Sequence, residues 1–215
     1  MDDHHLKRLG LYCSLMEEIK PRLAVMRQIA TMGELGTLPG RFVLESCYLQ
    51  LRMICELIAL ACLVAHGDIA GTRTANTRKH YEADWIMGML QELHPDFYPT
   101  PFVQHLVSEK TPNSPRRFHM EEIETGFLTR SDLVACNREC GKALHRGTVE
   151  GVLSRDQRQL SLKRISEWHN KAMTLLNLHM IRLIDRKLLY CVVLDAIEDG
   201  RVHASVVVEE DGGPS

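Results

Sequence analysis

The sequence predicts a mainly α-helical protein: a helical bundle with a long buried central helix and a small C-terminal antiparallel β-hairpin. Apolar residues recur at helical spacing through most of the 215 residues, and the segment 41–66 is apolar on nearly every side. Runs rich in β-branched residues replace this pattern near the C-terminus. We expect a helical domain over residues 1–187, a hairpin over 188–209 packed on it, and a disordered tail over 210–215.

The first third of the chain predicts two helices. Apolar residues at helical spacing predict a helix over 3–32, and Pro21 predicts that it is broken or kinked, because proline cannot donate a backbone hydrogen bond. Glycine and proline predict a loop over 33–40. The apolar helix over 41–66, ended by Gly67, belongs in the centre of the domain. Charged and polar residues interrupt it too often for a span of about 30 Å of hydrocarbon, so we expect no membrane segment.

The middle of the chain is less regular. After a polar loop over 67–78, the pattern predicts a short helix over 78–93. The stretch 94–128 holds five of the eight prolines, which predicts a long loop with short strands around 117–120 and 122–127. A connection of this length is more often functional than idle.

Two more helices and a hairpin are expected after residue 128. One helix begins near Ser131, where Thr129 and Asp132 have capping-box spacing, and ends near His145. Another runs from Ser154, spaced for a capping box with Gln157, to about residue 186, and its apolar face carries His179 as a buried, hydrogen-bonded histidine. Asp199-Gly200 predicts the turn of a hairpin between 188–194 and 202–208.

Composition narrows the classes of function. A net charge of −2 and a pI near 6.6 give no overall attraction to nucleic acid or to an anionic membrane, so any anion site must be local. The seven cysteines have no C-x-x-C spacing, and the N-terminus has no secretory pattern, which together predict reduced thiols and a cytoplasmic location. The sequence contains no Gly-x-Ser-x-Gly elbow and no glycine-rich phosphate loop. The spacing of histidines and cysteines predicts neither a metal site nor another cofactor.

The expected helix 131–145 carries the residues that are the best candidates for catalysis. Leu133, Cys136 and Cys140 form one apolar stripe, whereas Arg138 and His145, seven residues apart, lie together on the opposite side. A guanidinium beside an imidazole can hold a phosphate and move a proton, which is what phosphodiester cleavage without a metal requires. A solvated polar face of a helix has the same composition, so both interpretations stay open.

The run Arg138-Glu-Cys-Gly-Lys-Ala-Leu-His145 resembles the R-x(4–6)-H signature of HEPN-like proteins, which include metal-independent ribonucleases of toxin and phage-defence systems. The resemblance implies a homodimer with facing motif helices, in which Arg138 and His145 act on the 2′-hydroxyl and the scissile phosphate. Glu139 departs from the family, which often has Asn, Asp or His after the arginine, and an acidic neighbour would repel phosphate. The sequence around the motif is also similar to that of uncharacterised phage and bacterial helical proteins.

Four further polar residues are candidates for substrate binding. Asn137 and Lys142 accompany the motif. Arg52 and Glu56 lie on a charged stripe of the central helix, and the functional interpretation puts them at the mouth of the same site as His145. The spacing of Arg52 and Glu56 also permits an ion pair within the helix.

Two functions follow from these patterns. The first is an HEPN-like RNA-binding protein or metal-independent endoribonuclease, a homodimer with RNA as its partner and with Arg138 and His145 as catalytic residues. The second is a non-catalytic helical protein that binds another protein chain through the edge of the C-terminal hairpin and the Arg138 face.

Overall fold

The computed structural model describes residues 3–34, 36–37, 39–67, 69, 72, 82–108, 117–145, 161–184 and 188–208. The helices are α1 (Asp3–Glu34), α2 (Gly40–Ala65), α3 (Ala83–Leu93), α4 (Arg130–Leu144) and α6 (Leu162–Leu176). The strands are β1 (Thr100–Ser108), β2 (Arg117–Glu122), β3 (Leu178–Arg182), β4 (Leu188–Val193) and β5 (His203–Val208).

The fold class predicted from the sequence is wrong. The described residues are 60% helical and 19% strand, and the strands form one antiparallel sheet in the order β2-β1-β3-β4-β5. The expected hairpin does form, as β4 and β5, but it is the end of this larger sheet. The protein therefore has a mixed α/β fold.

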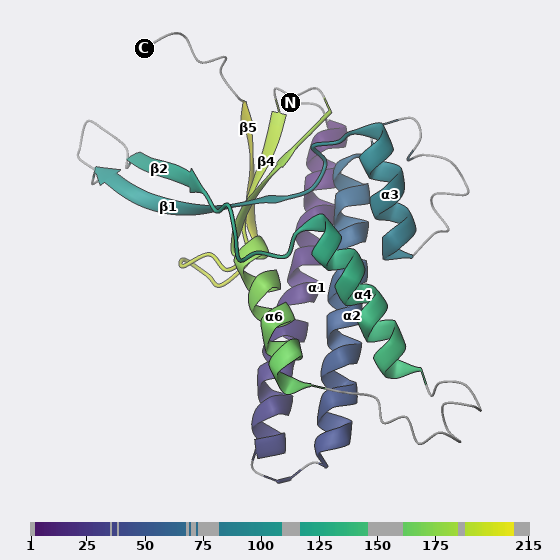
Figure 1. The fold of residues 1–215 in the computed structure, drawn as a ribbon. Helices are drawn as coiled ribbons and strands as arrows, with labels where there is room; N and C mark the ends of the chain where they lie inside the picture. The colour runs from purple at the N-terminus through teal and green to yellow at the C-terminus, as the bar shows by residue number, and fades with distance from the viewer. Residues whose placement is uncertain are drawn as a thin grey trace.

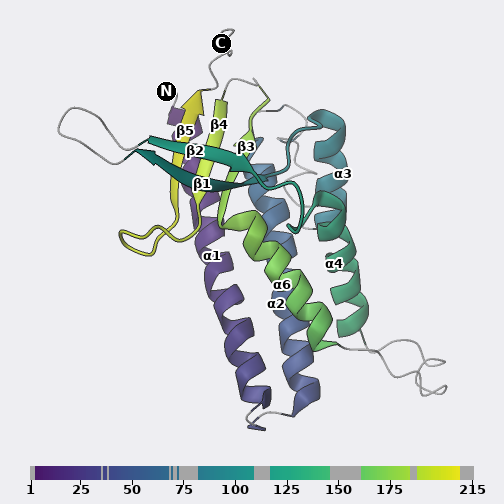
Figure 2. The same cartoon turned by 60° about the vertical axis from the view of Figure 1, so that its left-hand side comes forward.

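A helical layer and the sheet share one core. The long helices α1 and α2 lie side by side, α4 and α6 pack on α2, and the sheet lies at the end of the bundle near the N-terminus (Figures 1 and 2). Large buried side chains come from both parts, among them Tyr12, Tyr48, Ile54, Trp168 and Tyr190.

The N-terminal helix is not interrupted at Pro21. Helix α1 continues through the proline to Glu34. Proline removes one hydrogen bond from a helix, but Ile19 and Leu23 on either side of it are both buried. The packing of this apolar stripe offsets the missing hydrogen bond, so the predicted break does not occur.

The central helix agrees with its prediction. Helix α2 spans Gly40–Ala65, and twelve of its residues are buried. By length and composition it is also the one described helix that is apolar enough to cross a membrane, but 56% of its most apolar window is buried inside this fold. Burial of this kind is what the core helix of a helical layer requires.

The sequence did not predict strands β1 and β3. Strand β1 contains Pro101, a residue that is uncommon in strands, and its first two residues pair with β3, which lies far along the chain. The expected helix up to residue 186 ends at Leu176, and residues 178–182 instead pair along their whole length with β4. A short apolar run fits a helical stripe and a strand equally well, and tertiary pairing decides between them. The predicted start of that helix, at Ser154 and Gln157, lies outside the described residues.

His179 is buried and hydrogen-bonded as expected, although it lies on β3 and not on a helix. Its Nδ1 lies 3.0 Å from the carbonyl oxygen of Leu176, and its Nε2 lies 2.7 Å from the hydroxyl of Tyr12. A neutral ring that donates from Nδ1 and accepts from Tyr12 satisfies both contacts. Burial lowers the pKa of His179 to about 4.

This low pKa makes stability depend on pH. The unfolded chain binds a proton at His179 below about pH 6.5 and the folded protein does so only near pH 4, so the free energy of unfolding falls as the pH drops through this window. The loss reaches roughly 3 kcal/mol at pH 4. Urea unfolding from pH 7 to pH 4 should show a shallower pH dependence in His179→Gln than in the wild type; equal slopes in the two proteins would contradict the assignment.

Strands β1 and β2 project from the sheet as a two-stranded arm. Only Thr100 and Pro101 of β1 pair with β3, and the remainder of β1 pairs with β2 alone. Figures 1 and 2 show this arm, residues 102–108 and 117–122, extending away from the helices.

Candidate functional site

Helix α4 positions the predicted motif. The Thr129 side chain accepts from the Asp132 backbone at 3.1 Å, and the Asp132 side chain accepts from the Thr129 backbone at 3.4 Å, which confirms the predicted capping box. Lys171 of α6 donates to Asp132 at 2.8 Å and, through their hydrogen bond and opposite charges, lowers the pKa of that carboxyl although partial burial opposes this. Leu133, Cys136 and Cys140 are buried. The helix is therefore fixed at its start and along one face.

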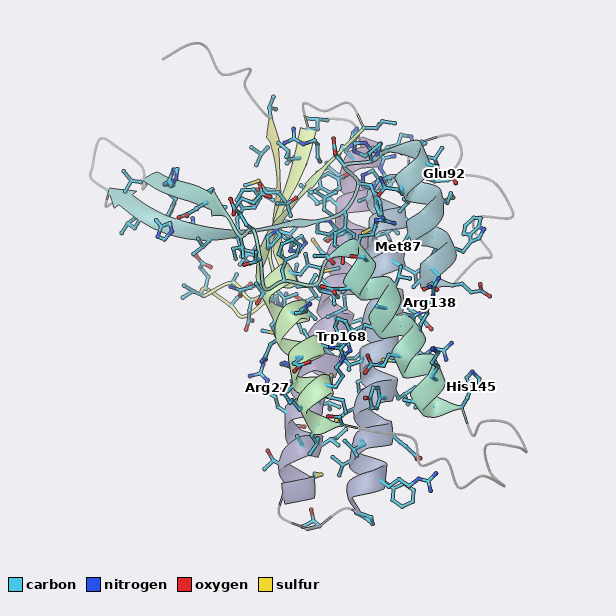
Figure 3. The ribbon with its side chains drawn as sticks, in the orientation of Figure 1. Arg27, Met87, Glu92, Arg138, His145 and Trp168 are labelled. Atoms are coloured by element: carbon cyan, nitrogen blue, oxygen red, sulfur yellow. The ribbon has the colours of Figure 1, made fainter. Side chains whose placement is uncertain are left out.

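Arg138 and His145 lie on the exposed side of this helix, as predicted. Figure 3 shows both side chains on the side of α4 that faces away from α2 and α6. Seven residues correspond to about 10.5 Å along a helix axis. The backbone N–H of His145 donates to Gly141, and the His145 side chain is exposed at the end of the helix. Lys142, also exposed, lies between the two in the last turn.

Asp84, the second residue of α3, holds Arg138. Its Oδ2 accepts from Arg138 Nε at 2.5 Å, while its Oδ1 accepts from Asn137 Nδ2 at 3.5 Å. The Arg138 side chain is nevertheless 67% exposed. Because Asp84 binds the Nε edge, the two terminal nitrogens of Arg138 make no hydrogen bond to any described residue and remain open to an anion. Asn137, in contrast, is half-buried and turned toward Asp84.

Glu139 is turned away from this face and has a structural role. Its carboxylate accepts from Tyr48 at 3.3 Å, from Arg164 at 3.1 Å and from the indole N–H of Trp168 at 3.0 Å. The Arg164 guanidinium also lies over the Trp168 ring, 4.1 Å from its centroid. This network joins α2, α4 and α6. The negative charge of Glu139 is thus paired between the helices.

Arg52 and Glu56 do not lie on the face of α4 that carries Arg138 and His145. They form an ion pair within α2, with Arg52 Nε 3.0 Å from Glu56 Oε1. Arg52 interacts electrostatically with Cys140, which lies on the side of α4 that packs on α2, roughly 140° around the helix from His145. The structure therefore brings Asn137, Arg138, Lys142 and His145 together on α4, but places the Arg52–Glu56 pair at another seam.

The thiols beside this seam are held neutral. The sulfur atoms of Cys136 and Cys140 lie 4.0 Å apart, and the pKa of Cys140 is raised by its hydrogen bond with Cys136 and by burial. A buried protonated thiol is a poor nucleophile. Among the residues that the structure describes, no group of three or more His, Cys, Asp or Glu side chains is arranged to hold a metal ion.

A hollow lies on the other side of the bundle, between α1, α2 and α6. It has a volume of about 290 Å³ and a largely apolar lining that includes Met26, Cys47 and Ile165, with Arg27 and His169 among its polar members. Figure 3 shows Arg27 far from Arg138. None of the residues predicted for the site lines this hollow.

Sequence reasoning did not find the partners of the motif. Asp84 is 54 residues from Arg138, and Tyr48 is 91 residues from Glu139. Trp168 is a buried core residue of α6, and its hydrogen bond to Glu139 spans 29 residues of the chain. No local spacing pattern signals contacts of this range.

Comparison with known proteins does not assign a family. The chain matches no protein-family model, no curated protein and no solved structure.

Proposed function

We propose that the exposed face of α4 binds RNA and that Arg138 and His145 cleave the bound strand without a metal. The observation that carries the proposal is the orientation of Arg138: Asp84 fixes its Nε edge while its terminal nitrogens stay open on the face that bears His145. A pre-oriented guanidinium suits bidentate binding of a phosphate. The resemblance of the Arg138 to His145 run to the HEPN-like signature points to the same chemistry.

Each side chain has a defined part in this proposal. Arg138 and Lys142 bind phosphate oxygens and stabilise the charge that develops on them. His145 moves a proton, either from the 2′-hydroxyl that attacks phosphorus or to the 5′-oxygen that leaves. The 2′-oxygen to phosphorus bond forms as the phosphorus to 5′-oxygen bond breaks, which leaves a cyclic phosphate and a 5′-hydroxyl. Glu139, paired with Arg164, does not oppose this.

Replacing Arg138 by alanine tests binding separately from cleavage. Loss of a charge-assisted phosphate contact costs about 1.5–3 kcal/mol, so the Kd for a single-stranded RNA should rise about tenfold or more. The slope of log Kd against log salt should also fall by about one unit. Fluorescence anisotropy at several salt concentrations measures both quantities.

Arg27→Ala is the matched control, because Arg27 is an exposed arginine on the far side of the bundle. It should leave the Kd and its salt slope unchanged. Equal effects of the two substitutions would indicate unspecific attraction of RNA to arginine and would remove α4 as the binding face.

A second candidate function is binding to another protein through the outer edge of the sheet. Its specific support is β5, the last strand of the sheet, on which Val207 and Val208 are exposed. Exposed apolar edges favour pairing with another chain. A stable protein partner that co-purifies without RNA, and is lost in Val207→Lys, would favour this function over the first.

A further inference from the structure

The arm of β1 and β2 carries exposed apolar side chains on both faces. Val103, Leu106, Val107 and Phe118 are between 39% and 65% exposed, and Figures 1 and 2 show no helix covering the arm. A two-stranded ribbon is marginally stable by itself in water. Apolar side chains gathered on such a ribbon indicate an interaction surface.

The register of the arm places two histidines opposite each other. His105 on β1 lies opposite His119 on β2, and Val103 lies opposite Glu121. On this face the Oε2 atom of Glu121 lies 3.2 Å from His105 Nε2. Within the described part of the chain, His119 makes no hydrogen bond or ion pair. The face thus holds two opposed histidines and one bonded carboxylate.

The strand that carries His119 is also an edge of the sheet. The strand order ends at β2, so the outer backbone groups of β2 are unpaired within the described residues. Along Phe118-His119-Met120-Glu121-Glu122, the histidine and a glutamate stand at equal distances on either side of Met120. This pattern is complementary to itself when a second copy runs in the opposite direction.

We propose that the chain forms a two-fold dimer by antiparallel pairing of β2 with β2 of a second copy, with Met120 opposite Met120. In this register His119 of each copy lies opposite Glu121 of the other, so the unpartnered histidine gains a carboxylate twice. The two arms become one four-stranded sheet, and Phe118 and Met120 of both copies lie on one face of it. The other edge strand, β5, has no acidic residue over 203–208 and lacks this self-complementarity.

This dimer does not rest on the proposed RNA function and differs from the arrangement that the HEPN resemblance implies. The arm and Arg138 on α4 lie on opposite sides of the molecule in Figure 3, which has the orientation of Figure 1. Pairing through β2 therefore leaves both α4 faces open and does not bring them together.

Exchanging the two charges tests the contact. Sedimentation equilibrium of the full chain should show a dimer. His119→Glu and Glu121→Lys should each raise the dimer Kd about tenfold or more. The first places two carboxylates opposite one another, and the second removes the carboxylate that binds His119 and puts an ammonium group in its place. The double variant places the new carboxylate at position 119 opposite the new ammonium group at position 121, a pair of opposite charges, and should return the Kd to within about threefold of the wild type. Ser205→Glu, on the exposed edge strand β5, is the control and should leave the Kd unchanged.

Three results would overturn the proposal. They are a wild-type chain that stays monomeric at about 100 µM, a double variant as weak as the single ones, and a monomer that binds a different protein through the arm. Thermal unfolding of every variant checks that the chain is folded. RNA binding should be the same in all of them, so failure of the dimer and failure of the RNA function remain distinguishable.

Discussion

Replacing His145 by alanine is expected to lower the rate of RNA cleavage by about 10²–10⁴-fold, the usual contribution of a general acid or base. Stability should hardly change, because the His145 side chain is exposed at the end of α4 and hydrogen-bonds to no described residue. Single-turnover cleavage of a defined RNA measures the first effect, and thermal unfolding measures the second. A shift of the melting temperature by more than a few degrees would make His145 structural.

His4→Ala is the control for this substitution. His4 is an exposed histidine near the start of α1, so its loss should leave the cleavage rate unchanged. If both variants cleave at the wild-type rate, His145 has no catalytic role, and any remaining activity belongs to another part of the chain.

Replacing Glu139 by alanine is expected to lower the free energy of unfolding by about 2–4 kcal/mol. The substitution leaves the indole N–H of Trp168, the hydroxyl of Tyr48 and the guanidinium of Arg164 without their shared acceptor. Trp168 and Tyr48 are buried, and leaving their polar groups unsatisfied costs more than an exposed hydrogen bond gains. Urea denaturation measures the change.

Two variants make this result specific. Glu139→Gln keeps acceptor capacity and should lose less stability than Glu139→Ala. Glu167 also binds Arg164, at 3.2 Å, but both side chains of that pair are 44% exposed, so Glu167→Ala should cost less than about 1 kcal/mol. If Glu139→Ala is as stable as Glu167→Ala, the network makes no special contribution to the free energy of unfolding.

Elements determined by local pattern were predictable from the sequence. The apolar pattern that predicts helix α2 lies entirely within its own sequence. Helix α4 begins at a capping box formed within four residues. Both helices, and the shared exposed face of Arg138 and His145, follow from such short-range patterns.

Elements that depend on distant partners were not predictable. Strand β3 satisfies a helical pattern and becomes a strand because β4 pairs with it, and β1 contains a proline that local rules assign to loops. The ion pair of Arg138 with Asp84 joins two helices separated by a long connection. Glu139 follows Arg138 directly in the sequence, but its partners Tyr48 and Trp168 are distant in the chain, so its place in the network between the helices was not predictable either.

The most direct test of the RNA function is incubation of the purified wild-type chain and His145→Ala with a mixed RNA pool in EDTA, followed by analysis of the fragment ends. The proposal predicts fragments with cyclic phosphate ends from the wild type, and none from the variant or from the matching DNA, which lacks the 2′-hydroxyl. An intact RNA pool with both proteins, or equal cleavage by both, would contradict it.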